Sequence, residues 1–285
     1  MSFGLPVRNG AATIAQTIES ILAQTLEDWE LVISDNLSAD GTSEICASFA
    51  ARDQRVRHVP TGRDLTQNEN FIEAFRLARG TFFRWYGDDD WMEPTYAERV
   101  VAAMDDCPKA VLCTTVQQCY RDGAPLPIND AVSRLGGVEG ADPGSRVRQL
   151  LHLLERGGFL GIDPLYSLVR REVAAGTGLT GGHRYSDFSF ACELALLGPF
   201  THVPELLAHR RLAGSARTNA TVVAAADAGW RRYIQREISL VVVARAARTL
   251  DPRSRLRLGV ALVGFAAREH AHGLRRRVRA LASRL

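Results

Sequence analysis

Short apolar strands alternate with helical segments along the first half of the chain, and this alternation constrains the fold more than any other feature. Strands are expected at 3–7, 29–34, 55–59, 81–86 and 110–116. Apolar residues recur with helical spacing at 13–24, and helices are also expected at 42–52, at 68–79 and from Pro94 onward. Strand–helix alternation at this spacing predicts an α/β fold with an open, mainly parallel central sheet flanked by helices.

Polar side chains follow three of these strands at the point where each strand ends. They are Arg8 and Asn9, then Asp35 and Asn36, then Asp88, Asp89 and Asp90. Each group by itself is typical of an ordinary turn. Ligands of such sheets bind at the carboxyl ends of the strands, so we expect the three groups to share one edge. Together they describe an acidic crevice with the hard oxygen ligands that Mg²⁺ and Mn²⁺ favour.

The chain lacks the glycine-rich phosphate cradles of other nucleotide-binding folds. It contains neither G-x-x-x-x-G-K-[ST] nor a G-x-G-x-x-G after the first strand. The charge of a bound diphosphate would therefore be met by a divalent metal rather than by backbone amides.

Composition indicates an ordinary globular protein. The chain of 285 residues is 46% hydrophobic and 24% charged, which suits one large domain with or without a small appendage. Its five cysteines lack C-x-x-C spacing, which argues against a disulfide framework or zinc site and suits a reducing compartment. We recognise no signal peptide and no apolar run long enough to span a bilayer. A cytoplasmic location is therefore expected.

The C-terminal segment is strongly basic and is expected to be helical. Residues 245–285 hold eleven arginines against Asp251 and Glu269, so their net charge is 11 − 2 = +9. Such helices could lie on the anionic inner face of a membrane, or they could pack on the catalytic domain and expose a solvated basic face. Both alternatives stay open at this point. Nucleic-acid binding is disfavoured because aromatic residues are not interleaved with the arginines.

Three stretches resemble family 2 glycosyltransferases with the GT-A fold. They are "GLPVRNG", "SILAQTLEDWELVISDNLSADGTSEI" and "NFIEAFRLARGTFFRWYGDDDWMEP", and the similarity is continuous over about the first 115 residues. It resumes at "YSDFSFACELALLGPFTHVPELLAHRR". The resemblance implies a nucleotide-sugar-binding half at 1–115, an acceptor-binding half at 116–222 and a helical basic extension at 223–285. It also implies inverting sugar transfer from a nucleotide-diphosphate donor, with Mg²⁺ or Mn²⁺.

The resemblance assigns roles to individual positions. Contacts with the nucleotide sugar are expected from Pro6, Arg8, Asn9, Asp35, Asn36, Asn70, Asp88 and Arg211. Pro6 and Asp35 would hold the base, with Asp35 accepting a hydrogen bond from a uracil or thymine imide. Asp88 would lie near the ribose. The metal site is assigned to Asp89 and Asp90, with Asp89 as the ligand and Asp90 mainly orienting the turn. Asp187 matches the general base.

The chain departs from the family pattern at several of these positions. Gly87 stands where the family often has the first aspartate, which moves ribose recognition to Asp88. Ser186 replaces an acidic residue before the base. No histidine follows Arg210 and Arg211, so these arginines are expected to contact the diphosphate alone.

The residues expected to contact the acceptor are less clearly indicated by the sequence than those expected to contact the donor. Trp85 and Tyr185 are candidates for acceptor contacts, although a strand tryptophan is more usual in a core and Tyr185 could belong to an ordinary surface loop. Residues 117–142 are expected to form a loop that shapes access of the acceptor.

The favoured function is therefore transfer of a sugar from a UDP- or dTDP-sugar to a hydroxyl of a glycan, a glycolipid, a lipid-linked acceptor or a secondary metabolite. Two alternatives remain: a sugar-phosphate nucleotidyltransferase and a non-catalytic sugar-binding relative. The first normally needs a glycine-rich basic loop after strand one, of which "PVRNGAAT" is a poor version. A homodimer is an open alternative to a monomer.

Overall fold

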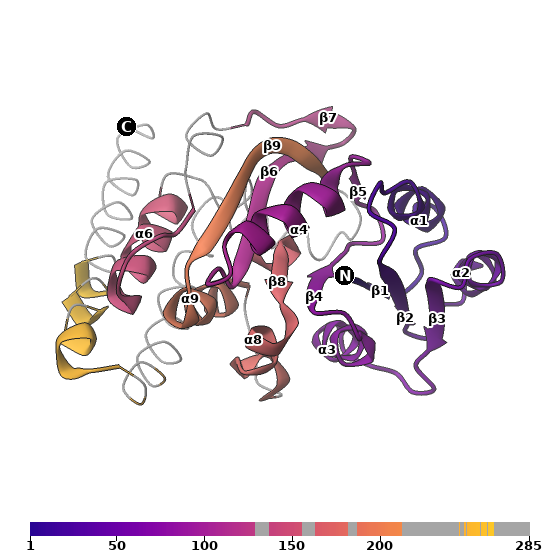
Figure 1. Ribbon diagram of the computed structural model, residues 1–285. Coiled ribbons are helices and arrows are strands. Elements are labelled where there is room, and N and C mark those ends of the chain that lie inside the picture. Colours follow the sequence, from indigo (N-terminus) through magenta and orange to yellow (C-terminus); the bar gives the residue numbers. More distant parts are fainter. Residues whose placement is uncertain are drawn as a thin grey trace, which may run out of the picture.

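A computed structural model describes residues 1–128, 137–155, 163–181, 187–212, 245, 248, 250–256, 258–260 and 262–264 (Figure 1). The strands are β1 Ser2–Val7, β2 Glu30–Asp35, β3 Val56–Pro60, β4 Phe82–Trp85, β5 Trp91–Met92, β6 Leu112–Arg121, β7 Ala124–Pro125, β8 Leu168–Arg170 and β9 Phe200–Arg211. The α-helices are α1 Ile14–Leu22, α2 Thr42–Ala50, α3 Gln67–Leu77, α4 Tyr96–Asp106, α6 Pro143–Glu155, α8 Arg171–Ala175 and α9 Asp187–Leu197. Two short 3₁₀ turns are η1 Pro164–Tyr166 and η2 Gly178–Gly181.

The described strands form one mixed, mostly parallel sheet. Its order is β3-β2-β1-β4-β8-β6-β9-β5, and β7 pairs with β6 outside this path. The pairs β3–β2, β2–β1, β1–β4 and β6–β9 are parallel, whereas β8 runs antiparallel to both β4 and β6. The expected α/β fold with a mainly parallel sheet is confirmed. Strand β6 crosses the expected boundary at residue 115, so the two halves share one continuous sheet.

The expected loop at 117–142 is wrong in its first part. Strand β6 continues to Arg121, and its residues from Gln117 onward pair with β9. The register shifts between Thr115 and Gln117, which lets the two strands stay paired through an irregularity. Pairing with β9 satisfies the backbone groups of this polar stretch, so a long-range partner overrides its local composition. Residues 129–136 of the expected loop lie outside the described residues.

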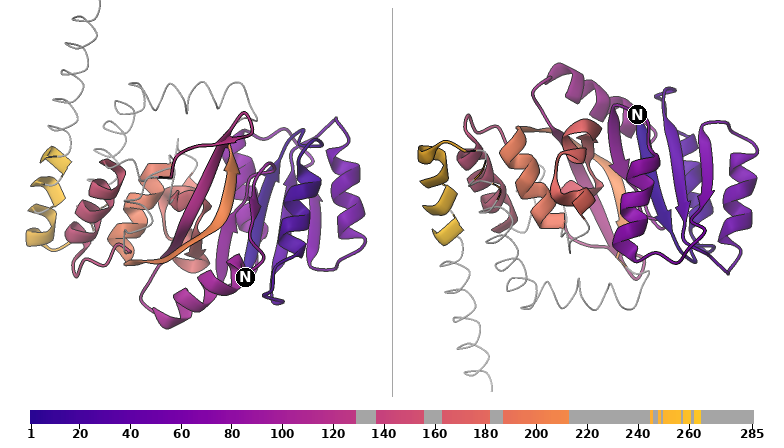
Figure 2. Two further views of the ribbon diagram at one scale, coloured as in Figure 1. Left: turned by 90° about the horizontal axis from the view of Figure 1, so that it is seen from above. Right: turned by 90° about the horizontal axis from the view of Figure 1, so that it is seen from below.

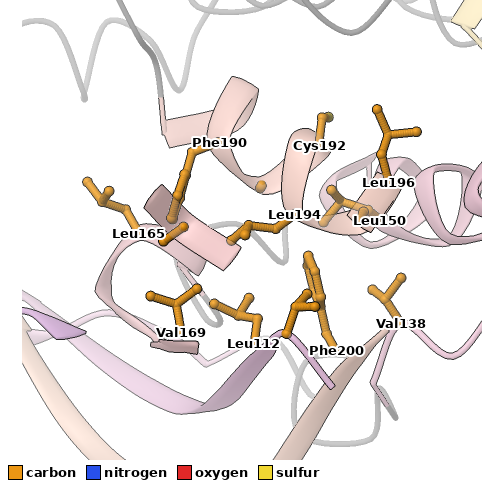
Figure 3. Close-up of a cluster of buried hydrophobic side chains, with 14 of the residues drawn as sticks. Leu112, Val138, Leu150, Leu165, Val169, Phe190, Cys192, Leu194, Leu196 and Phe200 are labelled. Carbon is orange, nitrogen blue, oxygen red and sulfur yellow. The ribbon is translucent and has the colours of Figure 1, made fainter. Parts of the chain in front are cut away.

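Helices cover both faces of the sheet, and the two views of Figure 2 show these layers. One apolar cluster joins the sheet to α1, α2 and α4, through residues such as Ile18, Phe49 and Val100. The other joins the opposite face to α3, α6 and α9. Figure 3 shows Leu150, Phe190 and other side chains of this second cluster. The sheet edge between the helices is left free to present polar residues.

The described part of the C-terminal extension packs on the α/β domain. Residues 252–256, 258–260 and 262–264 are helical and lie beside α6 in all views (Figures 1 and 2). Leu250, Leu258 and Leu262 belong to the apolar cluster that contains α6 and α9. Arg245 is paired with the buried Glu193 of α9 at 3.1 Å. One face of this helix is therefore part of the domain core, as the packing alternative predicts.

Within the part of the chain that the structure describes, none of the helices has the length and apolar character needed to cross a bilayer. The rest of the expected extension, at 223–244, 246–247, 249, 257, 261 and 265–285, lies outside the described residues.

Candidate functional site

The carboxyl ends of β1, β2 and β4 meet at one edge of the sheet, as the sequence predicts. These three strands are adjacent and parallel, with Val7 opposite Asp35 in the register. The aspartate turn after β4 is fixed against α1, because the Thr17 hydroxyl lies 3.0 Å from the carbonyl oxygen of Asp88 and 2.8 Å from that of Asp90. The three polar groups therefore share one edge.

A glycine after β1 makes room for the first aspartate. A Cβ atom at Gly10 would lie 2.3 Å from Oδ2 of Asp88, so a larger residue there would collide with the carboxylate. Gly10 thus lets the aspartate turn approach the start of α1 closely.

Asp35 is the expected partner of the base. Its side chain is only 1% exposed and accepts hydrogen bonds from the Ser38 amide at 3.2 Å and from the Ser43 hydroxyl, and it lies 3.1 Å from Nε2 of His58. Burial alone raises the pKa of Asp35, but the hydrogen bonds from Ser38, Ser43 and His58 outweigh it and hold the pKa below its usual value. Asp35 is therefore an ionised acceptor, most of whose oxygen lone pairs are already used.

Asn36 is buried and bonded to the segment before α3, so the expected nucleotide-sugar contact at this position stays a prediction that only its second amide hydrogen could serve. Its amide nitrogen donates to the Leu65 carbonyl at 2.7 Å, and its oxygen accepts from the Leu65 amide at 2.9 Å and from the Thr61 hydroxyl at 3.3 Å. The side chain is 3% exposed. Asn36 thus ties the segment before α3 to the end of β2.

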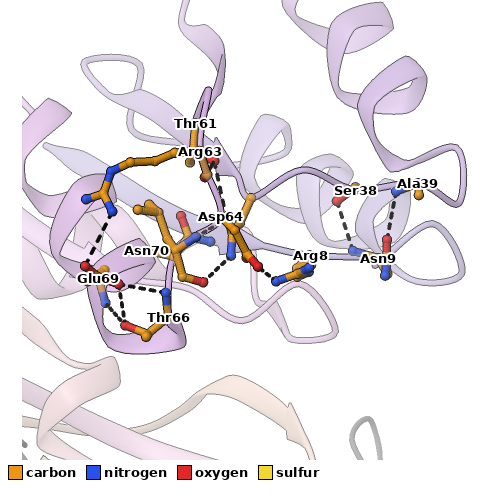
Figure 4. A network of polar contacts seen from close by, with 12 residues as sticks. Arg8, Asn9, Ser38, Ala39, Thr61, Arg63, Asp64, Thr66, Glu69 and Asn70 are labelled. Atoms are coloured by element: carbon orange, nitrogen blue, oxygen red, sulfur yellow. Dashed lines mark hydrogen bonds and ion pairs between the residues drawn. The ribbon is translucent and has the colours of Figure 1, made fainter.

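Asn70 lies in the first turn of α3, which begins with a capping box. Thr66 and Glu69 form this box through reciprocal hydrogen bonds (Figure 4). The buried Asn70 oxygen accepts from the Ser34 hydroxyl at 2.6 Å, and its nitrogen donates to the Val7 carbonyl at 3.3 Å. Asn70 therefore joins α3 to β1 and β2 and keeps one amide hydrogen for other partners.

The segment after β1 forms the exposed rim of this edge (Figure 4). Arg8 pairs with Asp64 at 2.5 Å, and both side chains are about half exposed or more. Asn9 has a φ of 59°, and its side-chain oxygen accepts from the Ala39 amide at 2.9 Å. Pro6 is buried inside β1. Arg8 and Asn9, the two expected nucleotide contacts after β1, are thus both exposed.

The three consecutive aspartates differ in their surroundings. Burial raises the pKa of Asp88 to about 6, and Asp90 and Asp40 add to this shift. Burial also raises the pKa of Asp89 to about 7, together with repulsion from Asp90 and Asp88 and against the attraction of Arg210. Attraction by Arg210 and a hydrogen bond from the Asp89 backbone amide offset this rise only in part, so the charge of Asp89 is poorly compensated.

Asp90 is turned inward and is held by arginines. The backbone amide of Arg211 donates to its Oδ1 at 3.2 Å, and Nε of Arg210 lies 3.5 Å from its Oδ2. Burial raises the pKa of Asp90, while Arg210 and Arg84 act in the opposite direction. With both oxygens facing arginine groups, Asp90 orients the turn.

Arg210 joins the two halves of the site. Its Nη1 pairs with Asp163, its guanidinium carbon lies 3.8 Å from the centre of the Tyr166 ring, and its side chain is 13% exposed. Burial alone lowers the pKa of Arg210, but Asp163 and Asp90 outweigh it and raise the pKa well above its usual value. The guanidinium is therefore permanently charged and sits between two buried carboxylates.

Asp187 is the first residue of α9 and is partly buried. Burial and repulsion from Asp163 raise its pKa to about 7, and attraction by Arg210 opposes them. The same guanidinium therefore attracts both Asp187 and Asp89. A carboxylate with a pKa near neutrality is suited to accept a proton.

Trp85 is not accessible to an acceptor, so that expectation is wrong. Its side chain has no exposed area, its Nε1 donates to the Phe71 carbonyl at 2.9 Å, and its ring packs against Phe75, Phe83 and Phe190. The alternation of side chains along β4 turns Trp85 into the core. Tyr185, the other expected acceptor contact, lies outside the described residues.

The aspartate turn fits a divalent metal only if the protein supplies few ligands. Among the described residues, no three or more His, Cys, Asp or Glu side chains are grouped to hold a metal ion. Asp89 combines a poorly compensated charge with partial exposure. A cation there would offset this charge and take its remaining ligands from phosphate and water, as Mg²⁺ usually does.

Sequence comparison decides the family. Residues 2–173 match the model of Glycosyl transferase family 2. The chain belongs to this family. Among its curated relatives from Bacillus subtilis, EpsH, named as a glycosyltransferase, is 31% identical over 116 residues, which cover 40% of this chain and 33% of EpsH. TuaG, named as a teichuronic acid biosynthesis glycosyltransferase, is 27% identical over 125 residues, 42% of this chain and 48% of TuaG. The matches thus span a third to a half of these relatives.

Solved structures of Staphylococcus aureus TarS share the fold of this family 2 chain. TarS 1–349 superposes with a TM-score of 0.62 at 12% identity, covering 93% of this chain and 70% of that one. The same protein in complex with UDP-GlcNAc gives a TM-score of 0.59 at 13% identity, covering 93% and 80%. The expected GT-A type of fold is confirmed.

Sequence reasoning missed Asp163 as a member of the site. Asp163 is 3% exposed, caps η1 by accepting from the Leu165 amide at 3.2 Å, and pairs with Arg210, which lies 47 residues further along the chain. No motif marks it in the sequence. The "RR" at the end of β9 was the only signal available, because an arginine that becomes buried there needs a carboxylate partner.

Proposed function

We propose that this family 2 member is an inverting glycosyltransferase that uses a UDP- or dTDP-sugar and a hydroxyl acceptor. One observation carries the proposal: Asp187 and the aspartate turn after β4 lie around the same guanidinium, that of Arg210. The donor-side edge and a carboxylate with a raised pKa are thus both under the influence of one buried cation. The complex of TarS with UDP-GlcNAc supports a uridine nucleotide as the first donor to test.

In the proposed reaction, Asp187 accepts the proton of an acceptor hydroxyl. The hydroxyl oxygen forms a bond to the anomeric carbon while the bond from that carbon to the diphosphate oxygen breaks on the opposite face. The electron pair of the broken bond leaves with the nucleoside diphosphate, and the single displacement inverts the configuration. General-base assistance of this kind contributes about 10²–10⁴-fold.

The remaining residues would bind the donor. Asp35 and the free amide hydrogen of Asn70 would face the base, and Asp88 the ribose. Arg211 lies over the Trp91 ring at 4.9 Å and donates to Gln16 at 2.6 Å, so it would reach a diphosphate only after a change of side-chain conformation.

Arg210 would also have to move to reach a diphosphate, because its guanidinium is held between Asp90 and Asp163. Its buried Nε has no hydrogen-bond partner among the described residues, although it lies 3.5 Å from Oδ2 of Asp90. Both arginines therefore stay candidates for the diphosphate contact.

Asp89 would hold the metal, Mg²⁺ or Mn²⁺. When bound, the ion supplies positive charge that stabilises the leaving diphosphate. The buried and paired Asp90 would keep the turn in place rather than bind the ion itself.

Product analysis tests the function directly. The chain would be incubated with UDP-GlcNAc, UDP-glucose or dTDP-glucose plus Mn²⁺, and release of the nucleoside diphosphate would be followed. Slow hydrolysis without an acceptor is expected for a transferase. Release of pyrophosphate from UTP and a sugar phosphate would instead favour the nucleotidyltransferase, and binding without turnover would favour the non-catalytic relative.

Replacing Asp89 by Ala is expected to abolish the effect of Mn²⁺ on UDP binding. The change also removes a carboxylate whose raised pKa reflects an unfavourable environment, so the melting temperature at pH 8 should equal or exceed that of the wild type. Calorimetric titration of UDP with and without Mn²⁺ measures the first effect. Asp105→Ala, an exposed aspartate on α4, is the matched control. Wild-type metal dependence in Asp89→Ala would show that the ion binds elsewhere.

The rate of transfer should rise with pH through about 7. Asp187 acts as a base only when ionised, and its pKa is raised to about 7, so kcat/KM should increase about tenfold per pH unit below 6 and level off above 8. Rates measured from pH 5 to 9 at saturating Mn²⁺ would reveal this profile. A flat profile across this range would contradict the assignment of the base.

A further inference from the structure

The helix that covers residues 252–264 carries apolar side chains on two opposite faces. It begins after Asp251, whose Oδ1 accepts from the amides of Arg253 at 2.9 Å and Ser254 at 3.1 Å, as an N-cap residue does. Leu258 and Leu262, exposed by 2% and 8%, face the core beside α6. This face accounts for how the helix is held on the domain.

The other face has no such partner among the described residues. Leu256, Val260 and Val263 are exposed by 70%, 66% and 70%. Their spacing of four and then three residues places them within about 60° of one another on a helix that turns about 100° per residue. We call these three residues the outer stripe. A Cβ atom at Gly259, which borders the stripe, would meet nothing within 4 Å, so the space beside it is open.

The outer stripe is unusual for a solvent-facing surface. In the described part of the chain only six large hydrophobic side chains are markedly exposed, and three of them make up this stripe. The other three, Leu37, Leu197 and Leu206, lie on separate elements and are 40–49% exposed. Single exposed apolar residues are normal, whereas three on one helical face indicate a contact surface.

The charges beside the stripe indicate an anionic partner. Arg253 is exposed and stands seven residues before Val260, so it lies beside the stripe. Arg255 is also exposed but lies nearer the inner face, where its Nε donates to the Leu250 carbonyl at 2.6 Å. The only described acidic residue of this helix region, Asp251, is used as the cap. Residues 245–285 together carry eleven arginines against two acidic residues. A second copy docked by its own stripe around a two-fold axis would bring these like charges together, which opposes self-association.

We propose that the outer stripe inserts into the interface of an anionic lipid bilayer, with Arg253 against the lipid phosphates. An apolar stripe bordered by arginines is the pattern of helices that lie in the plane of the membrane surface. The inner face, through Leu258 and Leu262, keeps the helix on the catalytic domain, so the domain itself is held at the lipid surface. This proposal does not depend on the sugar-transfer chemistry.

Vesicle flotation tests the proposal with the full chain. The protein would be mixed with vesicles of phosphatidylglycerol and phosphatidylcholine, or of phosphatidylcholine alone, and floated at 0.1 M and 1 M salt. Binding is expected only to the anionic vesicles and should fall at high salt, because the screening length shortens from ~10 Å to ~3 Å.

Variants distinguish binding through the outer stripe from nonspecific hydrophobic binding. The triple change Leu256→Ser, Val260→Ser and Val263→Ser should lower the vesicle partition coefficient at least about tenfold, because burying even one such side chain is worth about this factor. Because all three positions are exposed, the melting temperature of the triple variant should be unchanged. The control Leu197→Ser with Leu206→Ser, at exposed sites elsewhere, should leave binding within about twofold. Arg253→Gln should weaken binding to anionic vesicles.

Several results would overturn the proposal. Equal flotation with neutral and anionic vesicles would do so, as would full binding by the triple variant. A wild-type dimer in light scattering that becomes a monomer in the triple variant, with no change in flotation, would assign the stripe to a second copy. If the wild-type protein binds neither the anionic nor the neutral vesicles, the outer stripe does not bind lipid.

Discussion

Changing Asp187 to Asn is expected to lower sugar transfer by at least about 10²-fold while donor binding and the melting temperature stay near those of the wild type. Asparagine has the size of aspartate and can still cap α9, but it cannot take up the acceptor proton. Turnover with an acceptor, calorimetric binding of UDP and thermal unfolding would be measured on the same preparation.

A purely structural Asp187 predicts the opposite pattern. A capping residue would tolerate Asn with nearly full activity, whereas Asp187→Ala would cost about 1 kcal/mol of stability. Comparing Asn with Ala therefore separates capping from catalysis. Retained turnover in Asp187→Asn would remove Asp187 from the reaction.

Replacing Arg210 by Met is expected to destabilise the fold by about 3–5 kcal/mol at pH 8. The change keeps a similar side-chain volume but leaves Asp90 and Asp163, each 3% exposed, without their buried cation. For a chain of this size the melting temperature should fall by about 10 °C. Urea unfolding at pH 8 would give the loss of free energy.

The loss caused by Arg210→Met should shrink as the pH falls. Burial raises the pKa of Asp90 and Arg210 opposes this, so removing the guanidinium raises that pKa further. A carboxyl with a raised pKa in the folded state destabilises the fold increasingly as the pH rises above its unfolded value of about 4 and through its folded value. Unfolding at pH 5 should therefore reveal a smaller loss than at pH 8.

Two further variants define the cause of this destabilisation. The first is Arg211→Met, at the neighbouring arginine, which packs over the Trp91 ring. This change should lower the free energy of unfolding by less than about 1 kcal/mol, because Arg211 is only partly buried and its contacts are more solvated. Adding Asp163→Asn to Arg210→Met should recover part of the loss, since one of the stranded charges is removed. A loss below about 1 kcal/mol in Arg210→Met, or one that does not vary with pH, would show that the cluster is not held by this cation.

The expected edge of the sheet and the family could be read from the sequence because both depend on local order along the chain. Strands β1, β2 and β4 were anticipated within one or two residues, and their parallel pairing follows from the helices between them. Once the strands are parallel, residues that follow them must share an edge. Asp35 and Asp88 therefore lie where the alternation of elements predicts.

Individual side chains at that edge were less predictable, because their partners are distant in sequence. Asn36 is used by Leu65 and Thr61, and Trp85 is enclosed by aromatic residues from α3 and α9. A turn residue and a strand residue look the same in sequence whether they face a ligand or the core. The direction of each side chain was decided by what packs against it.

The sequence by itself determined the order of strands and helices, the acidic turn at 88–90 and the basic character of the C-terminal segment, since these need only composition and spacing. Only the tertiary structure decided that β6 continues through Arg121, that Arg210 lies between Asp90 and Asp163, and that the helix at 252–264 has one face in the core and one exposed. The physical reason is that strand pairing, burial of charge and exposure of an apolar face all depend on segments far apart in the chain. Local sequence cannot specify which of those segments will meet.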